Sequence, residues 1–439
     1  MIGKYCVTTF GCQMNSRDSE KLKGMLEVLG YTPSDREEDS DIVIFNTCTV
    51  RENANDRLFG RIGQLRKAKT ENPNMIIGVC GCMMQDPKAV EKLVSTYKHV
   101  DIVFGTFNLH HLPELIKRAV NGESGIIDII KDSKEIVEDL PSIRDFSYKA
   151  GVNITFGCDN FCTYCIVPFV RGRERSREVD DILQECRELV EDGVKEIMLL
   201  GQNVNSYGKG LENNCTFAQL LDKVAKIDGL KRLSFMTSHP KDLTDDIIEV
   251  IKNNDNILRS LHLPVQSGSN EMLRRMNRHY TREYYLNLIK KIQKEIPDIA
   301  ITTDIIVGFP GESEEDFVDT CRIVEEVGYD GAFTFIYSKR SGTKAADFTD
   351  HISQEIIDER FPRLLDIVHR TSNDQHNKRV GDIDKVLVEH KNNKEEGYLT
   401  GKTHHGGTVH FRGDSNLIGE IVNVRLVECR GFYYMGELV

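Results

Sequence analysis

The chain has 439 residues, enough for two or three domains, and a formal net charge of −12. An acidic chain can bind a polyanion only where positive charge is concentrated locally. No run of about 18 apolar residues is present, so we predict no membrane-spanning helix. The first residues, MIGKYCVTTF, lack the basic start and apolar run of a secretory signal. We therefore expect a cytoplasmic protein, in which clustered cysteines indicate metal or redox sites rather than disulfides.

Three cysteines in the first 120 residues each follow a short strand-like run. Cys12 lies in TFGCQMNSRDSE, Cys48 in DIVIFNTCTVRENA and Cys82 in IIGVCGCMMQD. Their separations of roughly 35 residues match one βα unit each, which predicts a doubly wound parallel α/β domain over residues 1–120. The three cysteines would then meet at one edge of the sheet. Three converging thiolates can hold a [4Fe–4S] cluster and leave its fourth iron open.

The alternative for these cysteines is burial in an apolar core, where free cysteine is common. Cys80 also competes with Cys82 as the third ligand, because only one residue separates them. We prefer Cys82 because it follows Gly81, where the strand is expected to turn. The remaining cysteines fall within apolar or amphipathic patterns and are predicted to be structural: Cys6, Cys186, Cys215, Cys321 and Cys429.

Residues 121–145 form an acidic stretch that we predict to be a linker, and residues 146–371 form the next predicted domain. This domain opens with a C-x3-C-x2-C triplet, Cys158, Cys162 and Cys165, in TFGCDNFCTYCIVPFVRGRERSR. With no fourth cysteine nearby, the triplet also favours a [4Fe–4S] cluster with one open iron, which indicates an enzyme. A zinc site would require paired C-x2-C units or added histidine, and the nearest histidines are His111 and His239.

Short apolar strands alternate with amphipathic helices after the triplet. The predicted strands are residues 151–156, 196–200, 232–236, 260–264, 299–307 and 332–336. Helical patterns between them include residues 179–192, 217–227, 284–295 and 314–327. Six such alternations predict a parallel sheet curled into a partial (β/α)6 barrel, with functional groups at the carboxyl ends of its strands.

Polar side chains and glycines follow several of these strands and are candidates for binding a cofactor. They are Gly201, Gln202, Asn203, Ser238, His239, Gln266 and Asp304. Taken singly each is weak evidence, because glycine at a turn is usually turn chemistry. Two basic stretches, residues 171–177 and 274–282, flank the predicted barrel mouth and are candidates for binding a polyanion.

The last predicted domain covers residues 372–439. A helical run over residues 354–378 precedes five short alternating strands, which suggests a small OB-like β-barrel. Nine lysines and arginines face ten acidic residues in this segment, so any RNA binding depends on local groups such as Lys402 and Arg412.

The triplet, together with Tyr164 before its third cysteine, resembles the radical S-adenosylmethionine superfamily. The words GCQMNSRDSE, NTCTVRENA and VCGCMMQ, with SFMTSHP and HLPVQSGS, extend the resemblance to the radical methylthiotransferases over nearly the whole chain. The forms GCQMN and TSHP resemble the branch that acts on N6-dimethylallyladenosine in tRNA.

This resemblance implies two [4Fe–4S] clusters, two S-adenosylmethionine molecules per turnover, and transfer of a methylthio group to C2 of the adenosine at position 37. It implies tRNA as partner, a C-terminal TRAM domain that grips it, an electron donor such as flavodoxin or ferredoxin, and a monomer. Tyr164 joins the cofactor-binding candidates. The RNA-binding candidates are Arg171, Arg173, Arg177, Arg274, Arg278, Lys402 and Arg412.

Two alternatives remain from the sequence. The same chemistry could act on threonylcarbamoyl-adenosine or on a side chain of a ribosomal protein. A protein of another class, a tRNA-binding protein with structural or redox-sensing clusters, would consume no S-adenosylmethionine.

Overall fold

The computed structural model describes residues 3–49, 52–212 and 214–439, without the side chains of residues 52–56. Val50 and Arg51 of the NTCTVRENA motif therefore lie outside the described residues. Contacts divide the chain into two compact units. Residues 1–146, 155–159 and 166–177 form the first unit, and residues 147–154, 160–165 and 178–439 form the second.

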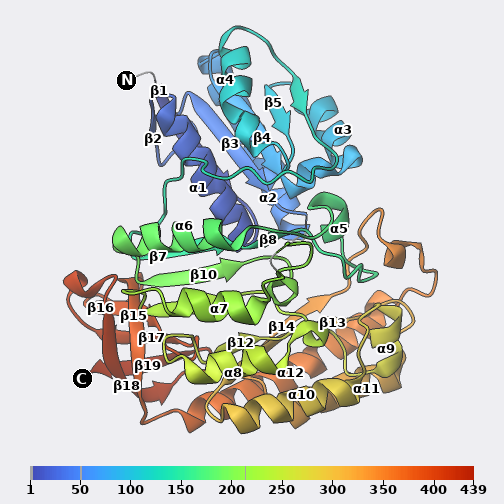
Figure 1. Cartoon of the computed structure of the whole chain (residues 1–439). Helices are drawn as coiled ribbons and strands as arrows, with labels where there is room; N and C mark the ends of the chain where they lie inside the picture. Colours follow the sequence, from blue (N-terminus) through green and yellow to red (C-terminus); the bar gives the residue numbers. More distant parts are fainter. Residues whose placement is uncertain (1–2, 50–51, 213) are drawn as a thin grey trace. The chain divides into compact units, whose positions relative to one another are not determined.

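The first unit is built on a six-stranded parallel sheet in the order β2-β1-β3-β4-β5-β6. Its strands are β1 (Gly3–Thr9), β2 (Tyr31–Pro33), β3 (Ile42–Thr47), β4 (Ile76–Gly81), β5 (Ile102–Phe104) and β6 (Ile126–Asp128). The helices are α1 (Gln13–Val28), α2 (Glu52–Glu71), α3 (Pro87–Thr96) and α4 (Leu112–Val120), with short turns η1 (Cys82–Gln85) and η2 (Leu109–His111). This is the predicted doubly wound fold (Figure 1).

Alternating side chains of β3 show why the sheet is covered on both faces. Ile42 and Ile44 belong to a core shared with α1 and α4, whereas Val43 and Phe45 belong to a core shared with α2 and α3. Strand β6 lies within the stretch predicted as a linker, yet it pairs with β5 at the sheet edge. The domain therefore extends beyond the predicted boundary at residue 120. Three short elements complete the unit: β8 (Thr155–Phe156), α5 (Val167–Val170) and β9 (Arg175–Ser176).

The second unit contains a partial barrel of parallel strands, as predicted. Two three-stranded sheets have the orders β11-β10-β7 and β12-β13-β14. They meet at a parallel bridge between Leu233 and Ile257. The strands are β7 (Lys149–Asn153), β10 (Glu196–Leu200), β11 (Arg232–Phe235), β12 (Ser260–His262), β13 (Ala300–Val307) and β14 (Gly331–Ile336). The strand predicted at residues 151–156 is interrupted at Ile154, so that β8 pairs with β9 instead.

Helices cover the outside of this barrel (Figure 1). They are α6 (Val179–Glu191), α7 (Phe217–Ala225), α8 (Asp245–Asn253), α9 (Asn270–Arg275), α10 (Arg282–Glu295), α11 (Glu314–Val327) and α12 (Gln354–Lys378), with turns η3 (Val204–Ser206), η4 (Pro240–Asp242) and η5 (Lys344–Asp347). One large apolar core joins them to the strands through residues such as Ile197, Leu233 and Ile301. None of the helices in the described part of the chain has the length and hydrophobicity that crossing a membrane would require.

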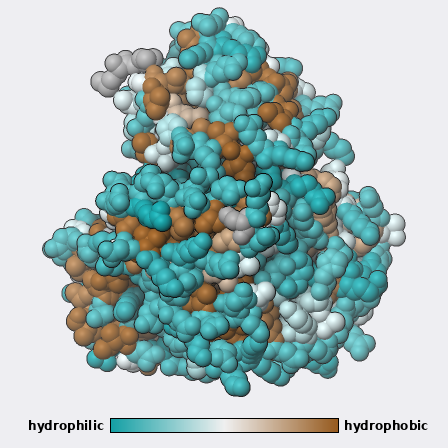
Figure 2. All heavy atoms as spheres, in the orientation of Figure 1, coloured by the Kyte–Doolittle hydropathy of each residue, from teal (hydrophilic) through white to brown (hydrophobic). Residues whose placement is uncertain are grey.

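A closed five-stranded barrel ends the chain, in the order β15-β16-β17-β19-β18. Its elements are β15 (Ile383–Lys391), β16 (Tyr398–Lys402), β17 (Thr408–Arg412), η6 (Ser415–Leu417), β18 (Ile421–Cys429) and β19 (Tyr433–Leu438). Buried residues such as Val386, Val409 and Phe411 fill it. Figure 2 shows apolar surface gathered over this barrel, where Phe432 and Leu438 are among the exposed residues.

Buried charge joins the two barrels of the second unit. Arg232 lies 3.0 Å from Glu196 and donates to the carbonyls of Lys402 (2.8 Å) and Thr403 (3.2 Å). Lys149 lies 2.6 Å from Glu389, whose carbonyl accepts from the hydroxyl of Tyr148 at 2.6 Å. Because Arg232 is only 3% exposed, its removal would leave Glu196 charged and buried without its partner.

Arg232→Met is expected to lower the free energy of unfolding by about 3–5 kcal/mol, the usual cost of breaking a buried ion pair on one side. Lys195→Met is the matched control, since the pair of Lys195 with Glu420 is partly exposed and should contribute at most about 1 kcal/mol. Urea unfolding followed by circular dichroism measures both. Equal effects for the two variants would contradict the structural role of Arg232.

Candidate functional site

The structure brings Cys12, Cys48 and Cys82 together at the carboxyl edge of the first sheet. Cys12 precedes α1, Cys48 follows β3 and Cys82 opens η1. The thiols of Cys12 and Cys82 lie 3.6 and 3.9 Å from the same atom, Oδ1 of Asn15. A methyl group added at Gly11 would come within 2.8 Å of Cβ of Cys48. The three cysteines are therefore neighbours at this edge of the sheet.

Cys80 and Cys82 lie in different surroundings. Gly81 between them has φ +96, a left-handed conformation, so the chain turns there. Cys80 is fully buried in the apolar core under α1 and α4, and burial raises its pKa well above the ordinary value. Burial also raises the pKa of Cys82 to about 11, although Arg171 opposes this; Cys48 and Cys12 raise it further. The thiol of Cys82 shares its contact with Asn15 with the thiol of Cys12, whereas Cys80 belongs to the apolar core.

The surroundings of Arg171 contradict its predicted role in RNA binding. Its guanidinium donates to Sγ of Cys82 (3.1 Å), to Asp18 (2.7 Å) and to Oδ1 of Asn15 (3.2 Å). The side chain is 7% exposed and cannot present its charge to a polyanion. No pattern in the sequence distinguishes it from its neighbours in the basic run, because its partners Asp18 and Cys82 come from distant segments.

The other predicted RNA-binding arginines include both buried and exposed residues. Arg177 is buried against Glu138 at 2.7 Å, which removes it from the candidates. Arg278 is buried as well, and for the same reason it is no longer a candidate for RNA binding. Arg173 and Arg274 are exposed and paired with Asp159 (2.7 Å) and Glu271 (2.6 Å).

The terminal barrel presents the remaining two RNA-binding candidates differently. Arg412 is exposed and lies over the ring of Tyr398, with 5.4 Å from its guanidinium carbon to the ring centroid. Lys402 is half-buried and donates to Thr408 at 2.9 Å; burial lowers its pKa.

Close backbone contacts constrain the conformation of the loop that carries the C-x3-C-x2-C triplet. Gly157 has φ +75, and a Cβ there would meet the carbonyl oxygen of Arg173 at 2.1 Å. Cys158 belongs to the first unit and donates its backbone N–H to the carbonyl of Gly172 (3.2 Å). Cys162 and Cys165 belong to the second unit, where the backbone N–H of Cys165 donates to the carbonyl of Cys162 (2.9 Å). Within the described residues, no three His, Cys, Asp or Glu side chains surround a single position as one metal ion requires.

Arg278 lies against the second part of the triplet. Its guanidinium donates to Sγ of Cys162 (3.4 Å), to the hydroxyl of Tyr164 (3.4 Å) and to the carbonyl of Pro264 (2.8 Å). A further contact joins Nε to the hydroxyl of Tyr280 at 3.0 Å. Burial is the largest of the causes that raise the pKa of Tyr164 well above its ordinary value. The phenol of Tyr164 therefore remains protonated.

Buried polar atoms that have no partner among the described residues gather after β10 and β11. They are Oδ1 of Asn203, both amide atoms of Asn205, Oγ of Ser238 and Nε2 of His239. Burial lowers the pKa of His239, assisted by Arg278 and Lys241, and so its imidazole is neutral. Since buried polar groups are almost always hydrogen-bonded, these atoms indicate a site that a polar ligand completes. Asn203, Ser238 and His239 were predicted; Asn205 was missed, although it follows the same strand.

The same strand ends carry backbone strain that sequence analysis did not detect. Thr237 has φ +73 and Gln266 has φ +70, a region that non-glycine residues rarely occupy and that is unusual for a β-branched side chain. Such conformations cluster at ligand sites. Gln266 is held there by two backbone bonds, from its N–H to Asp304 (2.8 Å) and from Ile306 to its carbonyl (2.9 Å).

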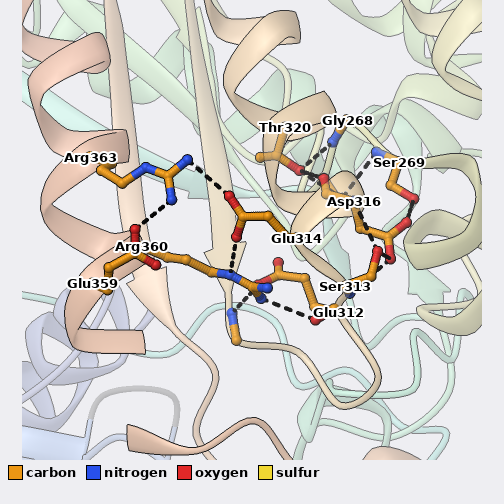
Figure 3. Close-up of polar contacts among 12 residues, drawn as sticks. Gly268, Ser269, Glu312, Ser313, Glu314, Asp316, Thr320, Glu359, Arg360 and Arg363 are labelled. Atoms are coloured by element: carbon orange, nitrogen blue, oxygen red, sulfur yellow. Dashed lines mark hydrogen bonds and ion pairs between the residues drawn. The ribbon is translucent and has the colours of Figure 1, made fainter. Parts of the chain in front are cut away.

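A polar network holds the loops after β12 and β13 (Figure 3). Arg360 lies 3.0 Å from buried Glu312, which accepts from the backbone N–H of Gly308 at 3.0 Å. Gly268 donates its N–H to Thr320 (3.0 Å), and a Cβ at this position would meet the carbonyl oxygen of Asp319 at 2.2 Å. Gly268 therefore permits close packing of the loop after β12 against α11.

On strands β12 to β14, polar and aromatic side chains lie on the face opposite to the apolar core that these strands share with the outer helices. Leu261, Leu263, Ile301 and Ile305 belong to that core, so the alternating residues His262, Thr302 and Asp304 face the barrel interior. His262 contacts Thr302 (3.0 Å) and Asp304 (3.5 Å), and its ring meets Phe333 edge-on at 5.9 Å. Phe333 and Phe335, on one face of β14, are 58% and 49% exposed. Sequence analysis missed this exposed aromatic pair, because alternation alone does not show which face is open.

The remaining predicted cofactor residues follow or lie within barrel strands. Gly201 is buried and Gln202 half-buried after β10, and Asp304 lies within β13. The barrel thus collects all the predicted cofactor-binding positions in the second unit, on five of its loops and strands.

Family comparisons agree with this arrangement. Residues 152–324 match the radical SAM superfamily, residues 377–439 match the TRAM domain, and residues 4–105 match uncharacterized protein family UPF0004. The fold is similar to the radical S-adenosylmethionine methyltransferase TsrM from Kitasatospora setae, with a TM-score of 0.56, 13% identity, and coverage of 79% of this chain and 77% of that one. The cobalamin-dependent radical enzyme OxsB has a TM-score of 0.54 at 14% identity, over 84% of this chain and 56% of that one. The chain is a radical S-adenosylmethionine enzyme, whose superfamily uses a [4Fe–4S] cluster and S-adenosylmethionine.

Its closer relationships are with proteins named tRNA-2-methylthio-N(6)-dimethylallyladenosine synthase. The protein from Lachnoclostridium phytofermentans is 56% identical over 99% of this chain and 95% of its own length. Those from Clostridium perfringens and Thermoanaerobacter pseudethanolicus are 52% and 51% identical over 99% of this chain, and over 97% and 92% of their own lengths. The chain belongs to this family, which confirms the resemblance seen in its cysteine motifs.

Gly81→Ala is expected to remove the iron that we predict Cys12, Cys48 and Cys82 to bind. A Cβ at this position would lie 2.4 Å from the carbonyl oxygen of Thr47, and φ +96 strains any L side chain. Cys82 would move away from Cys12 and Cys48, so anaerobically reconstituted protein should bind about half the iron of the unchanged chain. Colorimetric iron analysis measures the loss.

Gly60→Ala serves as the control for this substitution. Gly60 lies in α2 with nothing within 4 Å of its added Cβ. This variant should keep its iron and gain about 0.5–1 kcal/mol of stability, as alanine does over glycine inside a helix. Full iron content in Gly81→Ala would contradict the placement of Cys82 at the metal site.

Proposed function

We propose that this chain adds a methylthio group to C2 of N6-dimethylallyladenosine at position 37 of tRNA. The observation that carries the proposal is two separate sets of three cysteines, each without a fourth, in a chain of this family. One set would bind the reactive cofactor and the other the sulfur to be transferred. A protein that only bound tRNA would need neither open site.

Cys12, Cys48 and Cys82 are the proposed ligands of an auxiliary [4Fe–4S] cluster. The thiols of Cys12 and Cys82 share a contact with Asn15, and Cys48 is a neighbour of Cys82, which supports this proposal. Three thiols at a sheet edge fit the donor set that such a cluster takes. Cys158, Cys162 and Cys165 are the proposed ligands of the cluster that binds S-adenosylmethionine. When bound, the second cluster and S-adenosylmethionine supply a 5′-deoxyadenosyl radical, a species reactive enough for an unactivated aromatic C–H bond. Two S-adenosylmethionine molecules would be used per turnover.

The barrel residues are the proposed holders of S-adenosylmethionine. Unsatisfied buried atoms of Asn203, Ser238 and His239 support a polar ligand after β10 and β11. Neutral His239 can accept or donate a hydrogen bond without adding charge beside a sulfonium. Tyr164, Gly201, Gln202, Gln266 and Asp304 complete the set of proposed contacts.

Phe333 and Phe335 are the proposed platform for the modified base. The chain has no tryptophan, so stacking depends on other aromatic side chains, and these two are exposed at the open edge of the barrel. Their apolar faces also suit a dimethylallyl group. The base would have to leave its stack in the anticodon loop, which costs a few kcal/mol.

Arg173, Arg274, Lys402 and Arg412 remain as the proposed contacts to tRNA phosphates. These four cations, of which Lys402 is half-buried, act against a net charge of −12 and suggest binding with a modest dependence on salt. We further propose a monomer that acts in the cytoplasm, where tRNA is modified, and that accepts electrons from a flavodoxin or ferredoxin.

Iron content and products test this proposal together. Anaerobically reconstituted protein should hold about eight irons, and replacing the triplet by alanines should leave about four. Cys82→Ala should abolish methylthiolation of tRNA yet still form 5′-deoxyadenosine, whereas Cys80→Ala, outside the site, should retain methylthiolation. Nucleoside mass spectrometry and chromatography of 5′-deoxyadenosine provide the readouts. Consumption of S-adenosylmethionine without any change in tRNA would exclude the proposed substrate.

Arg412→Gln tests the terminal barrel. Loss of one phosphate contact should weaken tRNA binding at low salt and reduce the slope of log K against log salt by about 1. Arg430→Gln is the control, because the charge of Arg430 is paired with Glu428 at 2.9 Å on the same barrel. Filter binding over a range of potassium chloride measures both; equal slopes in all three proteins would remove Arg412 from the interface.

A further inference from the structure

Each of the two cysteine sites has one buried arginine that donates to a cysteine sulfur. Arg171 donates to Sγ of Cys82 at 3.1 Å, and Arg278 donates to Sγ of Cys162 at 3.4 Å. Their exposed fractions are 6% and 4%. Water therefore screens neither charge effectively, and both guanidinium groups act on the sulfur at short range.

The two arginines differ in how their charge is balanced. Arg171 forms an ion pair with Asp18 at 2.7 Å, and that carboxylate is 5% exposed. Besides Cys162, the contacts of Arg278 are the hydroxyls of Tyr164 and Tyr280 and the carbonyl of Pro264, all of them neutral. In the described part of the chain no carboxylate forms an ion pair with Arg278. Its buried charge is thus balanced by dipoles and by the sulfur itself.

This difference has a consequence for reduction. A [4Fe–4S] cluster that takes up one electron gains one negative charge, and a nearby buried cation stabilises that charge. Hydrogen bonds to the sulfurs and net local charge are established determinants of cluster potential. An ion pair such as Arg171–Asp18 has little net charge and shifts the potential less than an uncompensated cation at a similar distance.

We propose that Arg278 raises the reduction potential of the cluster at Cys158, Cys162 and Cys165 above that of the cluster at Cys12, Cys48 and Cys82. Arg171 positions Cys82 and, because Asp18 compensates it, leaves the auxiliary cluster harder to reduce. This inference rests on the proposed function. The electron comes from a low-potential one-electron donor, which is oxidised by one electron while the cluster is reduced by one; no bond forms or breaks. The first electron thereby reaches the cluster that binds S-adenosylmethionine.

The direct test compares the two clusters without changing either arginine. Full-length protein with Cys12, Cys48 and Cys82 replaced by alanine retains only the triplet cluster, and the converse variant retains only the auxiliary one. Potentiometric titration followed by electron paramagnetic resonance, without S-adenosylmethionine, gives each midpoint potential. We expect the triplet cluster to be the higher by at least 59 mV, a tenfold preference for a one-electron couple. The reverse order would overturn the inference.

Arginine variants then assign the cause. In the protein that retains only the triplet cluster, Arg278→Gln should lower the midpoint by at least 59 mV, whereas Arg278→Lys, which keeps the charge, should remain within 59 mV of the unchanged residue. Equal shifts for glutamine and lysine would mean that charge is not the cause and would overturn the assignment.

The auxiliary cluster provides the matched arm. Asp18→Asn should raise its midpoint by uncovering the charge of Arg171, whereas the double variant Asp18→Asn with Arg171→Gln should change it by less than tenfold, that is, by less than 59 mV. A double variant that shifts as far as Arg278→Gln would overturn the role of compensation. Iron content is measured for each protein: a chain that never holds two clusters refutes the proposed function, while two clusters in the wrong order refute only this inference.

Discussion

Parallel strands must be joined by crossovers, and so every strand of a parallel sheet ends at the same edge as its neighbours. The site of Cys12, Cys48 and Cys82 and the polar site of the partial barrel both depend on this constraint. In the first unit β1, β3 and β4 are adjacent in the sheet, and each releases a cysteine where its pairing stops. In the second unit, the polar residues after β10 and β11 gather for the same reason. Residues far apart in sequence thus converge without any dedicated scaffold.

Buried arginines are the second feature on which the structure depends. Arg171, Arg232, Arg278 and Arg360 are all almost completely buried, and each holds partners from distant segments. Arg232 and Arg360 are structural: they join the two barrels and fix the loops of Figure 3. Arg171 and Arg278 instead donate hydrogen bonds to cysteine sulfurs. Arg171 beside Cys82 lowers the pKa of that thiol against the effect of burial, which favours the thiolate that iron requires.

Much of the fold follows from local patterns. The alternation of apolar strands with amphipathic helices predicted both α/β units, and the strand bounds differ from the structure by only a few residues at most ends. The exceptions have clear physical causes. The strand predicted at residues 151–156 divides because Thr155 pairs with Ser176 of β9, a partner that no local pattern reveals. Strand β6 was taken for linker because only three residues pair at the sheet edge.

The sequence by itself determined the cysteine spacing, the strand–helix alternation and the terminal barrel, because periodicity and turn residues act over a few positions. It also favoured Cys82 over Cys80 through Gly81, whose left-handed backbone is a local property. Only the tertiary structure decided which arginines are buried, since Arg171 and Arg278 lie in basic stretches identical in kind to those of exposed Arg173 and Arg274. It alone placed Phe333 and Phe335 at the open edge of the barrel and gave Thr237 its strained backbone. Burial and strain are set by the groups that surround a residue, and these come from segments too distant for any local pattern to record.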